Sequence, residues 1–178
     1  MGLNRTAVIV LAVVVVAAGV APGAASAQDD PAWSDTLFAD LESMSETYNG
    51  NVDEAKADMD GPTRTVYNQL NGRVVNVYLH DTDVVYSFQM TTDGRITDLQ
   101  QSRRDDARLA MYLTRDTAER LTGADAPVDA FVEAVQTGRF VGSGDDRTVR
   151  GVVIRGESGH VVEQAKWTGI NLAKGFLF

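Results

Sequence analysis

DDARLAMYLTRDTAERLTGADAPVDAFVEAVQTGRFVGSG, residues 105–144, has the clearest structural pattern in this chain. Apolar residues alternate with other residues over 107–113, which predicts a strand with one apolar face. Thr114 occupies the position of a helix N-cap, and we expect the helix that follows to end at Gly123. Pro127 is suited to the first turn of a second short helix. Because the polar residues of this stretch lie at caps and turns, the pattern indicates packing rather than catalysis.

The residues before this stretch predict a β-meander. Alternating apolar residues mark strands over 74–80 and 84–91, and a weaker third strand covers 95–101. Asp93-Gly94, between the second and third strands, is a strong hairpin signal. Short turns favour antiparallel neighbours, so we expect the strand over 107–113 to continue the same antiparallel order. One apolar face per strand predicts a sheet that is covered on one side.

Helical periodicity precedes the meander. Ser34 is expected to cap a helix that ends at Asn49-Gly50-Asn51, and residues 52–59 add one or two further turns. Asp60-Gly61-Pro62 predicts a firm break in the chain.

The C-terminal part of the chain has a weaker pattern. Residues 140–143 and 149–155 are each expected to return to the sheet as a strand, whereas residues 160–178 favour no single element. The fold class predicted for the chain is α+β, with a largely antiparallel sheet of about five strands packed by helices on one face.

The first 27 residues match a secretory signal peptide. Arg5 precedes an apolar run over residues 7–20, and Ala25-Ser26-Ala27 supplies small residues at the expected cleavage site. The run is shorter than the roughly 20 residues that a spanning helix needs. We therefore expect cleavage after Ala27 and a location outside the cell or on the cell envelope, with an uncleaved N-terminal anchor as the alternative. Residues 28–178 are then expected to form a single domain.

Composition excludes several classes of function. The chain has no cysteine, so disulfides and thiolate metal sites are ruled out. The formal net charge is −9, and removal of Arg5 with the signal peptide makes it one unit more negative. Such an acidic surface suits either a high-salt habitat or simple solubility. No basic stripe is present to neutralise phosphates, so we expect no nucleic-acid partner.

The residues with reactive side chains form no catalytic pattern. His80 lies at a predicted strand end and His160 in a predicted turn, and there is no Gly-x-Ser-x-Gly nucleophile elbow. Asp58-x-Asp60-Gly61 resembles a fragment of a calcium loop, but the remaining ligand positions are not acidic. We therefore predict no catalytic residue, no metal and no cofactor.

Aromatic residues mark both ends of the chain after the signal peptide. Trp33 and Trp167 lie outside the predicted strands and suit core packing or a contact over the sheet. Phe176, Leu177 and Phe178 end the chain, and exposed termini seldom carry two aromatic residues. These three residues are expected to tuck into the body, to fill a cavity or to make a peripheral membrane contact.

The order of residues over 105–144 resembles the sterol-carrier-protein type 2 lipid-binding family. The resemblance extends upstream to Asn71-Gly72 and the strands after it. The matching residues are packing and capping residues: Asp106, Ala107, Leu109, Met111, Thr114, Leu121, Gly123, Ala130, Phe131, Gly138, Arg139, Phe140 and Gly144. Two features depart from the family pattern, namely a longer second helix through Glu133–Thr137 and a longer tail after Gly144.

The resemblance implies an α+β fold whose helices and sheet enclose an apolar tunnel for acyl chains or sterols. It implies no catalytic residue. Burial of each methylene is worth about 0.8 kcal/mol, so hydrocarbon contacts alone can supply affinity. Flexible methionines and large aromatic side chains suit an adaptable wall. The residues predicted to line the ligand site are Phe88, Met90, Leu109, Met111, Leu121, Phe131 and Val135.

The sequence thus predicts a secreted, non-catalytic module that binds a lipid or another hydrophobic small molecule. The same apolar side chains equally suit a filled core, so the alternative is a structural or interaction module of the cell envelope without a ligand. An enzyme that uses two facing carboxylates is the third hypothesis, and the predicted strand faces contain no inward-pointing acid to support it.

Overall fold

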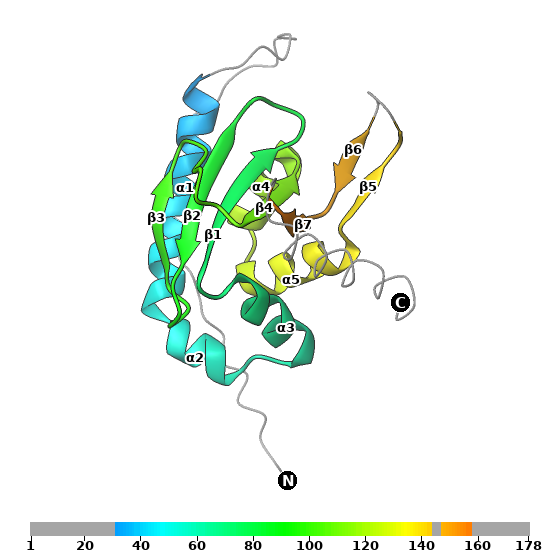
Figure 1. Ribbon diagram of the computed structural model, residues 1–178. Helices are drawn as coiled ribbons and strands as arrows, with labels where there is room; N and C mark the ends of the chain where they lie inside the picture. Colours follow the sequence, from blue (N-terminus) through cyan, green and yellow to red (C-terminus); the bar gives the residue numbers. More distant parts are fainter. Residues whose placement is uncertain (1–30, 144–146, 158–178) are drawn as a thin grey trace.

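The computed structural model describes residues 31–143 and 147–157 (Figure 1). Five helices precede or interrupt the strands: α1 (Pro31–Gly50), α2 (Val52–Ala57), α3 (Gly61–Leu70), α4 (Arg115–Thr122) and α5 (Pro127–Thr137). The main sheet contains β1 (Arg73–Leu79), β2 (Val85–Met90), β3 (Ile96–Gln100), β4 (Leu109–Leu113) and β7 (Val153–Gly156). A separate two-stranded ribbon consists of β5 (Arg139–Val141) and β6 (Thr148–Arg150). No helix among these residues has the length and apolar character needed to cross a membrane.

The main sheet has the strand order β3-β2-β1-β4-β7 and is largely antiparallel, as predicted. The hairpins β1–β2 and β2–β3 form the expected meander, and β7 runs antiparallel to β4. One pairing differs from the prediction, because β4 lies beside β1 and parallel to it, with Val77 opposite Met111. The strand over 107–113 was predicted to be antiparallel because the turns before it are short. Residues 101–108, however, form a connection that is long enough to cross the sheet.

That connection crosses the sheet on the face opposite the helices. The side-chain amide of Asn76 on β1 accepts a hydrogen bond from the backbone N–H of Arg104 (2.9 Å) and donates one to its carbonyl (3.0 Å). Asn76 and Ser87 are completely buried on this face. The second face is therefore partly covered by the chain itself, whereas the sequence predicted cover on one side only.

Helices pack on the other face and form the core with it (Figure 1). Leu37 of α1, Leu70 of α3 and Val135 of α5 join buried residues of the sheet in one hydrophobic cluster. Val75 of β1 and Leu109 of β4 are opposite each other in this layer, and both are almost fully buried. The alternation of apolar residues in each strand thus sets which face of the sheet receives the helices.

One predicted helix boundary is wrong, and one helix was not predicted. α1 begins at Pro31, so Ser34 is a helical residue rather than an N-cap, and its carbonyl accepts a hydrogen bond from the Tyr86 hydroxyl at 2.9 Å. The predicted break at Asp60-Gly61-Pro62 does separate two helices, but the second of them, α3, was not predicted. Asp60 Oδ1 accepts a hydrogen bond from the Thr63 N–H at 2.8 Å, and Pro62 occupies the first turn.

The prediction for 140–143 and 149–155 is correct only in part. Gly151, with φ of 65°, divides the second segment, so that its first half pairs with β5 in the ribbon and only its second half joins the sheet. A Cβ atom at Gly151 would lie 2.5 Å from the Ala134 carbonyl oxygen. The same carbonyl accepts a hydrogen bond from the Val152 N–H at 2.8 Å. This close contact with the end of α5 turns the ribbon away from the sheet.

Candidate functional site

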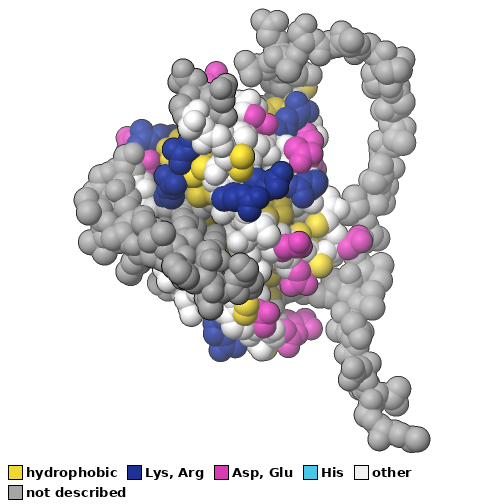
Figure 2. Space-filling view, turned by 90° about the vertical axis from the view of Figure 1, so that its right-hand side faces the viewer, with side chains coloured by type: hydrophobic (Ala, Val, Ile, Leu, Met, Phe, Trp, Pro, Cys, Tyr) yellow, Lys and Arg dark blue, Asp and Glu magenta, His cyan; other side chains and the backbone are white. Residues whose placement is uncertain are grey.

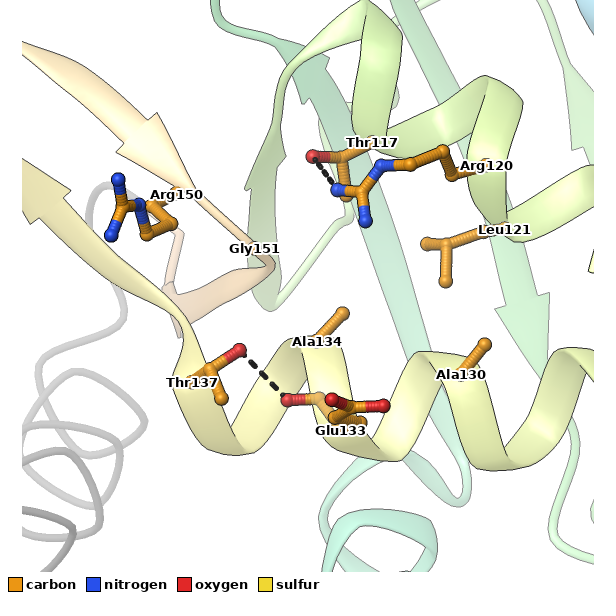
Figure 3. A pocket seen from close by; sticks show the side chains of 9 residues that line it. All are labelled: Thr117, Arg120, Leu121, Ala130, Glu133, Ala134, Thr137, Arg150 and Gly151. Atoms are coloured by element: carbon orange, nitrogen blue, oxygen red, sulfur yellow. Dashed lines mark hydrogen bonds between the residues drawn. The ribbon is translucent and has the colours of Figure 1, made fainter.

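A hollow of about 230 Å³ lies between α4, α5 and the Arg150–Gly151 turn (Figure 3). Its lining combines apolar and charged side chains: Thr117, Arg120, Leu121, Ala130, Glu133, Ala134, Thr137, Arg150 and Gly151. A second hollow of about 280 Å³ adjoins it and shares Thr117, Arg120, Arg150 and Gly151. The further lining residues of the second hollow are Thr114, Asp116, Val141, Thr148 and Val149. We refer to the two hollows together as the α4–α5 groove.

The apolar part of the groove comes from facing positions on the two helices. Ala130 and Ala134 lie one turn apart on α5, and Leu121 of α4 points toward them (Figure 3). Both alanine side chains are short, so they leave the space between the two helices unfilled at this point. Leu121 also packs against the hydrophobic core, so the apolar wall of the groove continues into the core.

Several polar contacts fix α4 at the edge of the groove. Thr114 caps the helix as predicted, with its side-chain oxygen accepting a hydrogen bond from the Thr117 N–H at 3.3 Å. Asp81, in the turn after β1, accepts a hydrogen bond from the Arg115 N–H at 2.9 Å. Glu119 accepts hydrogen bonds from Arg115 Nε (2.8 Å) and Trp33 Nε1 (2.7 Å). The position of α4 is therefore set by both the sheet and α1.

These contacts also change the acidity of Glu119. The hydrogen bond from Arg115, and after it the one from Trp33, lowers the pKa of the Glu119 carboxyl below its usual value of 4.5. The Arg115 guanidinium lies 4.1 Å from the centre of the Trp33 ring. Trp33 thus has a structural role between α1 and α4, in agreement with the predicted packing contact. Trp167 lies outside the described residues.

The charged residues of the groove differ in their contacts. Arg120 Nε donates to Asp116 at 3.1 Å, and Arg120 Nη2 donates to the Thr117 hydroxyl at 3.2 Å. Arg150 lies across the groove at the end of β6, and Glu133 lies on α5 (Figure 3). Arg120 and Arg150 each line both hollows.

The structure gathers the seven residues predicted to line a ligand site on the helix-covered side of the sheet. Met90, Leu109, Met111 and Val135 are buried members of the core cluster, and Phe88 and Phe131 pack against it. Leu121 also packs against the cluster, and it is the member of the predicted set that lines the α4–α5 groove. Whether any of the seven contacts a ligand stays a prediction.

Sequence reasoning missed the polar residues of the groove. Arg120, Glu133 and Arg150 were not singled out because each belongs to a different element, and nothing in their spacing brings those elements together. A signal was present in the small residues Ala130 and Ala134, which recur at helical spacing before two glycines. Such a pattern predicts close approach of a neighbouring backbone, which Gly151 provides.

The residues considered for catalysis or metal binding have structural contacts. One ring nitrogen of His80 is 2.8 Å from the carbonyl oxygen of Arg147, and the ring packs edge-on against Phe140. The hydrogen bond from Thr63 lowers the pKa of the Asp60 carboxyl, in keeping with its role as a helix cap. In residues 31–143 and 147–157, no three His, Asp or Glu side chains form a group that could hold a metal. His160 and the terminal Phe176, Leu177 and Phe178 lie outside the described residues.

A buried carboxylate lies on the opposite face of the sheet. Glu157, just after β7, accepts hydrogen bonds from Asn76 Nδ2 and from the Tyr78 hydroxyl, each at 3.1 Å. Burial, and after it the charge of Glu157, raises the pKa of the Tyr78 hydroxyl above its usual value of 10.0. Because Asn76 also holds Arg104, this network ties β1, β7 and the crossing connection together.

No family model matches the chain, and no curated protein was found to match it. Among solved structures, the chain is similar to one described as "UbiJ-SCP2 Ubiquinone synthesis protein". The two are 12% identical, the match covers 78% of this chain and 97% of the other, and the TM-score is 0.37. The α+β fold itself follows from the strand order and the helix packing given above.

Proposed function

We propose that the protein is a non-catalytic module that binds a hydrophobic small molecule, such as a lipid or a sterol-like compound, in the α4–α5 groove. The observation that carries this proposal is the gap between α4 and α5, where Leu121, Ala130 and Ala134 form an apolar wall that continues into the core. The signal-peptide pattern of residues 1–27 supports action outside the cytoplasm.

The free energy gained when a hydrocarbon chain leaves water for an apolar wall can supply the affinity of such a site. Each methylene moved from water to an apolar wall is worth about 0.8 kcal/mol, so several buried methylenes offset part of the cost of association. Ligand pockets commonly measure about 300–1,000 Å³. Each hollow alone is slightly smaller, with volumes of about 230 and 280 Å³, but the two adjoin and share four lining residues. A ligand with a single narrow hydrocarbon chain suits these dimensions.

Organic extraction and mass spectrometry of the purified protein test the proposal directly. We expect a co-purified lipid, or saturable uptake of a fluorescent fatty acid by the extracted and refolded protein. A clean extract together with no saturable uptake would overturn the proposal. Uptake that is linear in ligand concentration would also overturn it, because nonspecific partition onto the surface does not saturate.

A second candidate function is a cell-envelope interaction module with a filled core. The observation that favours it is the burial of Met90, Leu109, Met111 and Val135 in one cluster, where they pack against each other. The terminal residues Phe176 and Phe178 are the predicted contact with the envelope. In that case Phe176→Asp combined with Phe178→Asp should abolish association with envelope fractions, and unchanged fractionation would argue against this function.

A further inference from the structure

The chain contains four pairs in which Asn or Asp precedes glycine. They are Asn49-Gly50, Asp60-Gly61, Asn71-Gly72 and Asp93-Gly94. The backbone nitrogen of the glycine can attack the side-chain carbonyl carbon of the residue before it, because glycine has no side chain to hinder the close approach. The five-membered succinimide ring that forms then opens with water. Such a pair is therefore a site of spontaneous modification wherever the fold leaves it free to react.

The two Asp-Gly pairs are held in an unreactive, ionised form. A carboxylate is a poor electrophile, so attack by the glycine nitrogen needs the protonated acid. The hydrogen bonds from Thr63 lower the pKa of the Asp60 carboxyl, and the hydrogen bond from the Thr91 hydroxyl lowers the pKa of the Asp93 carboxyl. The Gly94 N–H also donates to the Thr91 carbonyl at 2.9 Å. Both carboxyls therefore stay ionised at neutral pH.

Asn49-Gly50 is held by short hydrogen bonds. The amide oxygen and nitrogen of Asn49 pair with the backbone of Ile96, each at 2.7 Å. Gly50 is the last residue of α1, so the backbone at Asn49 is helical. A succinimide at Asn49 requires the chain to rotate out of the helical conformation and the amide to leave Ile96. The fold therefore protects this pair.

Asn71-Gly72 is held more weakly. Asn71 lies between α3 and β1 (Figure 1), with φ of −57° and ψ of 129°, outside the helical conformation. Its Nδ2 donates to the Thr92 carbonyl at 3.2 Å, whereas its buried Oδ1 has no hydrogen-bond partner among the described residues. The Gly72 N–H is 3.4 Å from the Thr91 carbonyl oxygen, which is longer than a typical N–H···O bond. Gly72 is also exposed, so water can reach the ring.

We propose that Asn71 is the site at which the folded protein deamidates. The backbone nitrogen of Gly72 forms a bond to Cγ of Asn71, the Cγ–Nδ2 bond breaks, and ammonia leaves with the proton from the Gly72 N–H. One water molecule then opens the succinimide at either of its carbonyls and gives aspartate or isoaspartate at position 71. Water is the only other reactant, so the step needs no enzyme and no redox partner.

The new acid disrupts the contact between the end of α3 and the turn of the β2–β3 hairpin. Replacement of Nδ2 by a carboxylate oxygen places two hydrogen-bond acceptors against each other at the Thr92 carbonyl. Asp and Glu side chains on the face shown in Figure 2 lie on the surface, but this carboxylate forms at a half-buried position. The isoaspartate product also adds a methylene to the main chain just before β1. Modification should therefore lower the thermal stability of the protein.

Peptide mapping of aged protein tests the assignment. The purified protein is incubated in mildly alkaline buffer, and the acid forms at Asn71 and Asn49 are separated by chromatography and quantified by mass spectrometry. In the folded protein Asn71 should convert at least roughly tenfold faster, because reaction at Asn49 must first break its two short hydrogen bonds. In urea both sites should convert at similar rates, since each precedes glycine. Equal rates in the folded protein would overturn the proposal, as would an unmodified Asn71 under conditions in which the unfolded chain reacts.

Asn71→Gln is the matched variant, because glutamine keeps the amide but would have to form a six-membered ring. It should abolish conversion at this position and slow the fall of Tm during incubation. Asn68→Gln, at an exposed position of the same helix, should age like the wild-type protein. An equal fall of Tm in all three proteins would overturn the proposed effect on stability and leave the modification site intact. The comparison of Asn71 with Asn49 in the wild-type protein decides the site even where Asn71→Gln is unstable.

Discussion

The side chain of Asn49 pairs with both backbone polar groups of Ile96. Its Oδ1 accepts the N–H of Ile96 and its Nδ2 donates to the carbonyl of Ile96, each at 2.7 Å. Ile96 is the first residue of β3, the outer strand of the sheet, and Asn49 lies at the end of α1. One amide thus occupies both backbone hydrogen-bonding groups of Ile96, the first residue of an edge strand whose free groups could otherwise pair with another chain.

Asn49→Ala should destabilise the fold by about 1–3 kcal/mol, because it leaves two partly buried backbone groups without partners. The urea midpoint of unfolding measures the effect. Glu46→Ala is a matched control, because Glu46 is exposed on the same helix. Similar midpoints for the two variants would mean that water replaces the Asn49 amide at no cost.

Gly151→Ala should destabilise the protein by about 1–3 kcal/mol, since the residue has φ of 65° and its Cβ would lie 2.5 Å from the Ala134 carbonyl oxygen. Gly50→Ala is the control, because a Cβ at that position has no atom within 4 Å. Thermal unfolding compares the two. An unchanged Tm for Gly151→Ala would show that the end of α5 and the ribbon move apart without cost.

Ala130→Phe should reduce uptake of a fluorescent fatty acid at least roughly tenfold, because the larger side chain would fill the apolar part of the groove. Val128→Phe, at an exposed position on the same helix and outside both hollows, should leave uptake unchanged. Equal affinities for the two variants would place the ligand away from the groove. Both proteins should first be checked for an unchanged circular dichroism spectrum.

Stability should fall as pH rises from 10 to 12, and Tyr86 should be one cause. Burial, and after it the charge of Asp35, raises the pKa of Tyr86 from 10.0 to about 12. The folded state keeps the proton over a range in which the unfolded state has lost it, so this contribution is complete below pH 10 and lost toward pH 12. Urea unfolding of Tyr86→Phe should show a flatter dependence on pH. If the free energy of unfolding depends on pH equally in both proteins, groups other than Tyr86 cause the loss of stability at alkaline pH.

Trp33 fluorescence should report the protonation of Glu119. The folded-state pKa of Glu119 is lowered by Arg115 and then by Trp33, so the stabilising interaction is present above the usual value of 4.5 and lost as pH falls through the lowered pKa. A Trp167→Phe background isolates the signal of Trp33. The emission of Trp33 should shift below pH 4.5, and Glu119→Gln should abolish the shift. A shift that persists in Glu119→Gln would have another origin.

The local elements could be predicted because their signals are local. Thr114, Gly123 and Pro127 mark the bounds of α4 and α5 through capping and the fixed φ of proline, which need no knowledge of the rest of the fold. The meander could also be predicted, because apolar residues alternate along its strands and Asp93-Gly94 marks the turn between two of them.

Interactions between distant residues could not be predicted in the same way. The parallel pairing of β4 with β1 depends on the crossing connection that Asn76 holds, and nothing in the spacing of apolar residues specifies which free edge a strand will join. The α4–α5 groove likewise depends on α4, α5 and the Arg150–Gly151 turn coming together from separate parts of the chain. Leu121, in the apolar part of the groove, could be singled out because periodicity identifies a core-facing residue. Periodicity gives no such signal for Arg120 and Arg150, which belong to separate elements.

The place of β4 beside β1 also has a consequence for the order of assembly during synthesis. The first three strands emerge together and pair through near neighbours, but the inner edge of β1 has no partner until residues 109–113 leave the ribosome. A chain folded only as far as β3 therefore has an incomplete sheet, with an open edge at what becomes its centre.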